Sequence, residues 1–536
     1  MSAAGSSPTT ATGAGYTPAK PMISPWLIAP LVAMAAFMEV LDTTIANVAL
    51  PHIAGAMSAT VDESTWVLTS YLVANAIVLP LNGFFSAVFG RKKYFMGCMA
   101  VFTISSLMVG LAPSFPILLI CRVLQGLGGG GLQPGTQAIL RDSFPREKIG
   151  AAMAVYGIVV VVGPVLGPLL GGWITDNYSW RWCFLINVPI GIVTMLALLV
   201  LLRDPPTQRR VKISETGVDY IGLGLITLGL ASLQIMMDRG QDADWFSSPT
   251  IRLLAFLAIF GLVVGFIWEW YEPHPIINFR LLKDNNFGLA TLGMFIFGGI
   301  LYSTTTLLPL MVQTLMGYDA RQAGMVLAPG GMVVFCLMPL VGFLVPRVPT
   351  RWLITFGILV NVAALMLMGG LNLSADFATL AWCRGVQGLG LAFLFVPFNT
   401  AAFAFVPRDR ISDASGILNL ARNIGGSVGI SAATAFVANS AQRQQNFLVG
   451  NVTRSNPVYP RVLHGLTSML ERAGLSAGHA VKTAEAVIYN QLHGQASMLG
   501  YVDAFHDLAI MFLLVIPVAM LLRTPSFKKA APAVVE

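Results

Sequence analysis

Long apolar runs recur along this chain, and they constrain its fold more than any other feature. Each holds about 20 residues, the length that an α-helix needs to cross a hydrocarbon layer about 30 Å thick. We count about fourteen such runs between residues 26 and 523. Charged residues make up only 11% of the sequence, whereas soluble proteins hold about 25%. The sequence therefore predicts an all-α integral membrane protein with fourteen transmembrane helices.

The basic residues are spread through the short segments between these runs, although the net charge is +7. This spread is unlike the clustered basic face of a nucleic-acid-binding protein and is typical of membrane topology. Most lysines and arginines fall in the tails and in alternate segments, so the positive-inside rule predicts that both termini are cytoplasmic. Cysteine and histidine form no cluster at ligand spacing, and we expect no metal site.

The fourth run carries a sequence motif that is repeated in the second half of the chain. Arg122-Val-Leu-Gln-Gly-Leu-Gly128 is matched by Arg384-Gly-Val-Gln-Gly-Leu-Gly390. Such a repeat predicts two six-helix halves with the same orientation, and it leaves two helices inserted between them. The predicted segments are a disordered cytoplasmic tail (1–22), a first half (23–203) and a linker with the two inserted helices (204–271). A second half (272–523) and a second cytoplasmic tail (524–536) follow.

Four further motifs lie in the first half and the insertion. They are Leu41-Asp42-Thr-Thr-Ile-Ala-Asn47-Val-Ala-Leu-Pro51, Arg122-x-x-Gln125-Gly126, Gly163-Pro164-x-x-Gly167-Pro168-x-x-Gly171-Gly172 and Leu233-Gln-Ile-Met-Met-Asp238. With these motifs, residues 25–523 resemble the fourteen-span drug–proton antiporters of the major facilitator superfamily, of the EmrB type. The resemblance implies alternating access, with protons exchanged for hydrophobic or amphipathic toxic compounds, at a bacterial inner membrane.

Three charged residues within the spans are candidates for proton coupling: Glu39, Asp42 and Arg122. The two acids are three residues apart and share one face of the first span. Asp42 lies about 13 Å from the outer end of its helix and Arg122 about 10 Å from the outer end of its own. In the family that the chain resembles, these two spans are neighbours. A carboxylate beside a buried arginine stays ionised, and one that loses this contact in a dry cavity takes up a proton. The alternative is a permanent ion pair that only holds the helices together.

The second half repeats the arginine but not the acid. The position that corresponds to Asp42 falls near Tyr302, where there is no acidic residue. We therefore expect proton chemistry in the first half alone. Arg384 and Arg422 either bind anionic groups of a substrate or brace the second half. We assign six polar residues of the spans to a substrate cavity: Glu39, Gln125, Gln133, Asn399, Asn419 and Arg422.

Two mechanical elements follow from the resemblance. In the fifth span, the prolines remove helix hydrogen bonds and the glycines allow close packing against the other half, so this helix is a predicted hinge; its residues are Gly157, Gly163, Pro164, Gly167, Pro168 and Gly171. The loop between the second and third spans is a predicted cytoplasmic gate, with Gly83, Gly90, Arg91 and Lys92. There Ala87 and Val88 replace the family's usual Asp-Arg pair, which puts its salt-bridge latch in doubt.

Residues 439–503 are predicted to form a long periplasmic segment with two amphipathic helices, at 459–475 and 480–499. Transporters of the EmrB type work with a periplasmic adaptor, a membrane fusion protein, and with an outer-membrane channel. The segment is a candidate dock for that adaptor, or else it caps the transporter.

The chain has no Gly-Lys dipeptide, so it lacks the phosphate-binding loop that would hold ATP. We expect no cofactor and a proton gradient as the energy source. A second hypothesis is a dedicated exporter of a metabolite such as a fatty acid or siderophore. A membrane enzyme would need paired catalytic groups, which are not evident, and Asp42 with Arg122 argues against a sensor built on an inactive transporter.

Overall fold

The computed structural model describes residues 24–145, 148–202, 219–241, 243–273, 275–407, 410–450, 452–453 and 456–523, and these residues form helices and no strand. The tails predicted at residues 1–22 and 524–536 lie outside the described residues, and so does most of the predicted linker before residue 219.

The helices fall into three groups along the chain. The first half contains α1 (Pro25–Met57), α2 (Val61–Ser64), α3 (Trp66–Phe89), α4 (Arg91–Gly110), α5 (Phe115–Gly129), α6 (Leu132–Ser143), α7 (Ile149–Asn177), α8 (Trp182–Leu185) and α9 (Asn187–Leu201). The insertion contains α11 (Tyr220–Arg239), η2 (Trp245–Ser247), α12 (Pro249–Tyr271) and η3 (Phe279–Lys283). The second half contains α13 (Asn285–Leu315), α14 (Ala320–Leu344), α15 (Thr350–Met368), α16 (Phe377–Ala402), α17 (Ile411–Val449), α18 (Val458–Arg472), α19 (Ala477–Leu513) and α20 (Ile516–Leu521).

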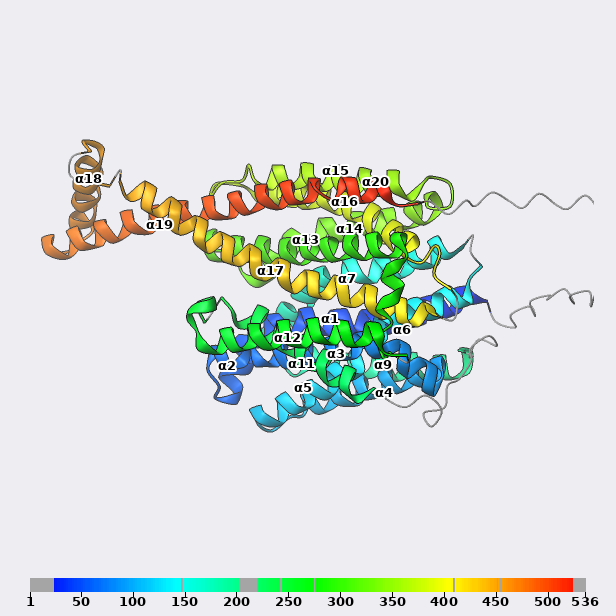
Figure 1. Ribbon diagram of the computed structural model, residues 1–536. Helices are drawn as coiled ribbons and strands as arrows, with labels where there is room; N and C mark the ends of the chain where they lie inside the picture. The colour runs from blue at the N-terminus through cyan, green and yellow to red at the C-terminus, as the bar shows by residue number, and fades with distance from the viewer. Residues whose placement is uncertain are drawn as a thin grey trace, which may run out of the picture.

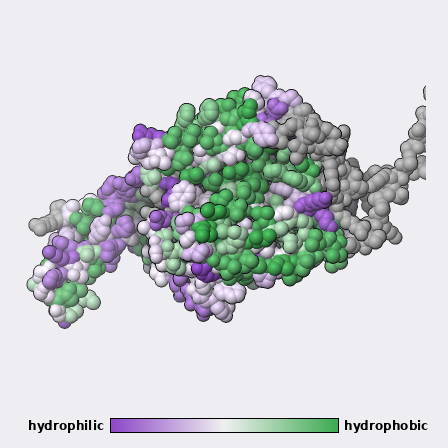
Figure 2. Space-filling view, turned by 90° about the horizontal axis from the view of Figure 1, so that it is seen from below, coloured by the Kyte–Doolittle hydropathy of each residue, from purple (hydrophilic) through white to green (hydrophobic). Residues whose placement is uncertain are grey.

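Thirteen segments of the described chain are long and apolar enough to cross a membrane. The remaining predicted span, the thirteenth, corresponds to α17, which is less apolar because it carries Asn419, Arg422 and Asn423 and a polar outer end. On the face seen in Figure 2, apolar side chains cover the bundle, and a more hydrophilic projection leaves it at one end. The fold is that of an all-α, multi-pass membrane protein, as predicted.

The helix α1 begins and α20 ends at the same end of the bundle, at the right of Figure 1. We call this end the terminal side and the opposite end the far side. An even number of crossings between the first and the last helix requires this arrangement, and it agrees with the prediction that both termini lie on one side of the membrane.

The predicted fourth span is two helices rather than one. The helix α5 ends at Gly129, and α6 begins at Leu132. Pro134 has no N–H with which to bond the Gly130 carbonyl, and the four consecutive glycines favour no helical backbone. The counterpart in the second half, α16, lacks this glycine run and is continuous over the same region. The break therefore reflects local sequence and not the architecture of the repeat.

The two halves meet through two pairs of long helices, α3 with α17 and α7 with α14. Glycine allows the helices to approach closely on the terminal side. A Cβ atom at Gly416 would lie 2.6 Å from the Leu79 carbonyl oxygen, and one at Gly150 would lie 3.1 Å from the Gly342 carbonyl oxygen. Direct hydrogen bonds between the two halves also lie on the terminal side, such as Asn82 to the Ser412 carbonyl at 3.4 Å. The halves are thus closed against each other on the terminal side.

On the far side, the inserted helix α11 connects the two halves. Asp238 accepts a hydrogen bond from Thr69, and Arg239 donates to Thr65 at 3.0 Å, so α11 is tied to α3 of the first half. Gln234 accepts from Ser427 at 3.1 Å, and the Met237 carbonyl accepts from Ser431 at 2.5 Å, which ties α11 to α17 of the second half. The insertion therefore lies beside the outer parts of α3 and α17 and contacts both halves.

The outer segment is built differently from the prediction. The first of the two predicted amphipathic helices, 459–475, is confirmed as α18 (Val458–Arg472). The second, 480–499, is not a separate helix, because α19 runs without a break from Ala477 to Leu513, and α17 likewise continues beyond its predicted end to Val449. The helices α17 and α19 leave the bundle beside each other, and α18 lies across them at the tip (Figure 1). The absence of a strong helix breaker at either membrane boundary explains the continuity, because an established helix gains a hydrogen bond with each added residue.

A leucine at position 416 tests the close approach of α3 and α17. Gly416→Leu is expected to destabilise the folded protein by about 1–3 kcal/mol, because the new side chain displaces α17 from the Leu79 carbonyl. The measurement is the thermal unfolding midpoint in detergent. Gly97→Leu is the matched control, since a Cβ there has no neighbour within 4 Å. Equal midpoints for the two variants would contradict the close packing of α17 at Gly416 against α3.

Candidate functional site

A fully buried ion pair joins α1 to α5. The Arg122 Nη1 atom lies 2.5 Å from the Asp42 Oδ2 atom, and both side chains are 0% exposed. The Arg122 Nε–H donates to the Val67 carbonyl of α3 at 2.9 Å. The Tyr71 ring lies 4.4 Å from the guanidinium carbon and covers one of its faces. The sequence prediction that the two charges lie at one depth on neighbouring helices is consistent with this contact.

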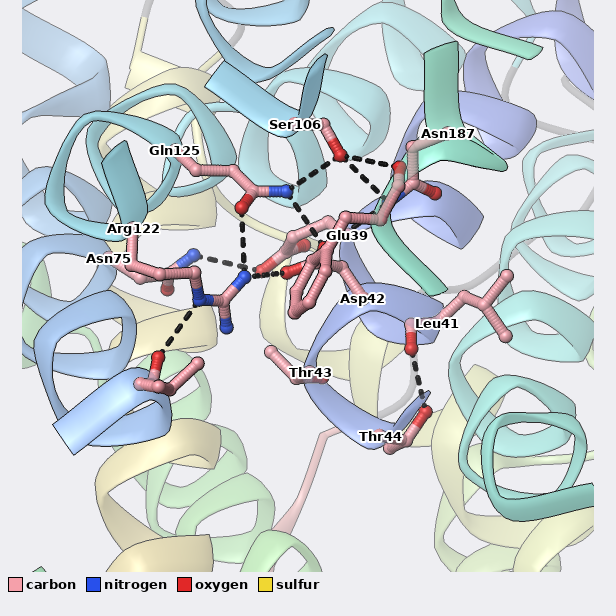
Figure 3. A network of polar contacts seen from close by, with 12 residues as sticks. Glu39, Leu41, Asp42, Thr43, Thr44, Asn75, Ser106, Arg122, Gln125 and Asn187 are labelled. Carbon is pink, nitrogen blue, oxygen red and sulfur yellow. Dashed lines mark hydrogen bonds and ion pairs between the residues drawn. The ribbon is translucent and has the colours of Figure 1, made fainter. Parts of the chain in front are cut away.

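Polar side chains of α5 and of two more helices, α4 and α9, surround the Asp42 carboxylate (Figure 3). Gln125 donates to its Oδ1 atom at 2.7 Å and accepts from Arg122 at 2.8 Å, so it links the two charges. Asn187 of α9 donates to the same oxygen at 3.2 Å, and Ser106 of α4 accepts from both amides. A carboxylate that is removed from water is stabilised by hydrogen bonds of this kind, and the same bonds fix its position.

The second half repeats this arrangement without an acid. Thr304 stands 80 residues before Arg384, as Asp42 stands 80 residues before Arg122. Arg384 bonds to Gln387, the counterpart of Gln125, and to Thr305 at 3.0 Å, while Gln387 donates to Thr304 at 3.0 Å. The geometry of the network is kept, but a hydroxyl replaces the carboxylate. This agrees with the expectation that only the first half holds an ionisable acid at this place.

A second polar layer crosses the interface between the halves. Glu39 of α1 accepts from Asn75 at 3.0 Å and is 3% exposed. Gln133 of α6 accepts from Tyr156 at 3.0 Å and from Arg422 of α17. Further along the interface, Asn419 donates to Gln137 at 3.1 Å. Carboxyl, amide, phenol and guanidinium groups of both halves are therefore concentrated in one buried layer.

This layer includes four of the six residues that the sequence assigned to a substrate cavity: Glu39, Gln133, Asn419 and Arg422. The other two lie elsewhere. Gln125 belongs to the Asp42 network, and Asn399 lies at the terminal end of α16, where its side chain bonds to the Phe395 carbonyl of its own helix at 2.9 Å. The Asn399 carbonyl accepts from Arg141 of the first half at 3.0 Å.

Sequence reasoning missed several members of both networks: Asn75, Ser106, Gln137, Tyr156 and Asn187. Each is a polar residue within an apolar span, which is a usable signal because a polar group in lipid needs a partner inside the bundle. That signal cannot say which partner the group meets. Among the described residues, no group of three or more histidine, cysteine or acidic side chains is placed to hold a metal ion.

The predicted gate loop lies at the terminal side. Gly90 joins α3 to α4 with a φ of 85°, which favours glycine. Arg91 forms an ion pair with Asp142 at the end of α6, and Lys92 donates to the Leu199 carbonyl at 2.7 Å. The Asp413 side chain of the second half packs directly against Gly83. Ion pairing at this loop is thus retained within the first half, although Ala87 and Val88 replace the family's usual pair.

The glycines of α7 were predicted to pack against the other half, and for three of them this is wrong. Gly163, Gly167 and Gly171 recur every four residues, so they share one face, and that face meets Val40, Thr44 and Ile45 of α1 in the same half. Only Gly157 of the predicted set faces the second half, at Met338 and Phe395. The helix α7 is continuous despite Pro164 and Pro168.

Comparison with known proteins identifies the family. The Major Facilitator Superfamily profile matches residues 32–430. The chain belongs to this superfamily of membrane transporters.

Three relatives are similar over nearly their whole length. The chain is 35% identical to the fatty acid resistance protein FarB of Neisseria gonorrhoeae, over 95% of this chain and 98% of FarB. It is 33% identical to the multidrug export protein EmrB of Escherichia coli (strain K12), over 94% of this chain and 97% of that protein. It is 29% identical to the colistin resistance protein EmrB of Acinetobacter baumannii, over 91% and 94%. The resemblance to the EmrB type is thereby confirmed.

Solved structures confirm the fold at much lower identity. The human organic anion transporter MFSD10 superimposes with a TM-score of 0.59 at 14% identity, over 93% of this chain and 100% of that one. A bacterial homologue of the human drug peptide transporters PepT1 and PepT2 gives a TM-score of 0.57 at 12% identity, over 93% and 98%.

Removing Arg122 tests how far the buried ion pair stabilises the first half. Arg122→Ala leaves Asp42 buried without its counter-ion and is expected to destabilise the protein by about 3–5 kcal/mol. Arg122→Lys keeps the charge but loses the planar donors that reach Asp42, Gln125 and the Val67 carbonyl together, so a smaller loss is expected. Denaturation in detergent measures both.

The double variant Asp42→Asn with Arg122→Gln provides the control, because it removes both charges. Its stability should be well above that of Arg122→Ala. If the double variant is the less stable of the two, the cost does not come from an uncompensated charge.

Proposed function

We propose that this protein is a proton-coupled antiporter that exports hydrophobic and amphipathic toxic compounds by alternating access. The observation that carries the proposal is the buried Asp42–Arg122 pair, a single ionisable acid held by an arginine inside the bundle. The relatives named for multidrug export and for resistance to fatty acids and colistin support an export function. The energy source would be the proton gradient, without ATP or another cofactor.

Asp42 would change its charge during the cycle. While it contacts Arg122, the carboxylate remains ionised; when helix movement separates the two, the dry surroundings favour a neutral, protonated acid. Five helices and the short α8 contribute to the network: Asp42 from α1, Val67 from α3, Ser106 from α4, Arg122 and Gln125 from α5, Phe184 from α8 and Asn187 from α9. A shift of any of them changes the contact. Protonation and helix position are therefore coupled.

The closed terminal side fits one state of such a cycle. With the basic loops in the cytoplasm, the terminal side is the cytoplasmic side. The direct bonds between halves, including Asn82 to Ser412 and Arg141 to Asn399, would then seal the cytoplasmic entrance. Opening toward the cytoplasm would require these bonds to break while the far side closes.

Substitution of Asp42 tests the coupling. Asp42→Asn keeps the size of the side chain but cannot release a proton, so proton-driven efflux should be abolished while substrate still binds. The assay is flux in proteoliposomes under an imposed pH gradient, with equilibrium binding measured on the same preparation. Glu39→Gln is the control and should reduce flux less. Pumping by Asp42→Asn at the wild-type rate would remove this residue from the mechanism.

We further propose that the protein is the inner-membrane part of a tripartite pump in a bacterium with two membranes. The outer extension of α17, α18 and α19 supports this, because it projects from the bundle as a surface for a periplasmic adaptor (Figure 1). Its tip is amphipathic: Val458, Val462 and Met469 of α18 are all exposed. The adaptor would in turn connect to an outer-membrane channel.

Shortening the extension separates docking from gating. Replacing residues 443–496 with a short Gly/Ser linker should leave transport across a single reconstituted bilayer intact, since the bundle helices and the networks remain. Resistance in cells with an outer membrane should fall, because substrate would be released into the periplasm. If transport in liposomes falls as much as resistance, the extension is part of the outer gate. Full resistance would exclude docking at this surface.

Dedicated export of a fatty acid is a second candidate. The 35% identity to FarB over 98% of that protein favours it. Competition in the flux assay between a fatty acid and a panel of unrelated lipophilic drugs distinguishes the two. Competition by fatty acids alone would indicate the dedicated exporter.

A further inference from the structure

Arg422 is a buried cation at the interface of the halves that lacks a paired anion. Its side chain is 0% exposed, and it lies in the terminal part of α17. No carboxylate oxygen of the described residues lies within salt-bridge distance of it, in contrast to Arg122. A guanidinium inside a bundle costs about 2.5–3.5 kcal/mol on insertion scales, so it normally has a counter-charge.

The partners of Arg422 leave part of its donor capacity unused. Its Nη2 atom donates to the Gln133 amide oxygen, but Nε and Nη1 have no hydrogen-bond acceptor among the described residues. The carbonyl of Gln133 also accepts from Tyr156, so it is shared. Unused donors on a buried cation are suited to an anionic ligand.

Glu39, the acid of the first half in this layer, likewise has only one of its two carboxylate oxygens hydrogen-bonded. Glu39 accepts from Asn75 through Oε1, and its Oε2 atom has no partner among the described residues. Among the described residues, Glu39 and Arg422 do not form an ion pair with each other. One belongs to α1 of the first half and the other to α17 of the second, so the space between them changes whenever the halves move. This is the position of a substrate site in a transporter that alternates access.

We infer that Arg422 is the receptor for the anionic headgroup of an amphipathic acid, with a carboxylate as the preferred group. This inference rests on the proposed export function and adds its substrate class. The carboxylate accepts from the unused N–H groups of Arg422, and Gln133 is a positioning residue that holds the guanidinium from the opposite half. Arg384, by contrast, has only its Nε unused, because both of its terminal nitrogens already donate to Gln387, Thr304 and Thr305 of its own half, and we expect it to bind no headgroup.

The probes are dodecanoate and dodecyltrimethylammonium, which share a chain length and differ in charge. Equilibrium binding is measured on the full-length protein in lipid nanodiscs. Arg422→Gln is expected to weaken dodecanoate binding at least tenfold and to leave dodecyltrimethylammonium binding unchanged or tighter. Arg384→Gln is the matched control, a buried arginine of the same half, and should bind dodecanoate as the wild type does. Equal loss of both probes in Arg422→Gln would overturn the inference and indicate a bracing role.

A second variant keeps the guanidinium. Gln133→Glu places a carboxylate against Arg422 that competes with the ligand, so it should lower dodecanoate affinity at least tenfold. Unchanged dodecanoate binding in this variant would overturn the inference even if Arg422→Gln does not fold.

The outcome also separates this inference from the proposed function. Asp42→Asn should bind dodecanoate normally but fail to transport it. If Arg422→Gln binds dodecanoate normally and wild-type transport still depends on the pH gradient, the inference fails and the antiporter remains. If wild-type transport does not respond to the gradient, the proposed function fails whatever Arg422 binds.

Discussion

The buried contact between Arg122 and Asp42 is the interaction on which the first half of this bundle depends. A charge inside the membrane must find its partner within the protein, and removing one member of a buried pair is costly. The arginine donates one hydrogen bond to the backbone of α3, one to α1 and one to its own helix, and the carboxylate accepts others from α5 and α9. These helices converge on one point because the charges allow no other arrangement.

The helix α7 is the long helix of the first half that contributes no side chain to this network. Its glycine face packs on α1, and its other side meets α14 of the second half. A smooth glycine surface has few interlocking side chains, so the contact of α7 with α1 is made by close packing. It is therefore suited to transmit movement between the rigid Asp42 network and the opposite half.

The two halves carry two copies of one polar site, and the copies differ chemically at one position. Thr304 fills the place of Asp42, while the arginine and glutamine are kept. The second half thus holds a buried arginine without an acid, where the first half holds an arginine paired with Asp42. Between the two copies, Glu39 and Arg422 add a layer that belongs to both halves. In the proposed mechanism, proton coupling at Asp42 and headgroup binding at Arg422 take place at separate sites.

The sequence by itself determined the membrane class, the duplicated halves, the insertion and the pairing of Asp42 with Arg122. Span length, repeated motifs and the energetic cost of a charge in lipid are properties of the residues, and they hold whatever the helices pack against. Only the tertiary structure decided that Gln125 serves Asp42, that Asn399 lies at the terminal end, that the glycines of α7 face α1, and that α17 and α19 continue beyond the membrane. Helical periodicity states which residues share a face, but the neighbour that this face meets is set by how all the helices pack together.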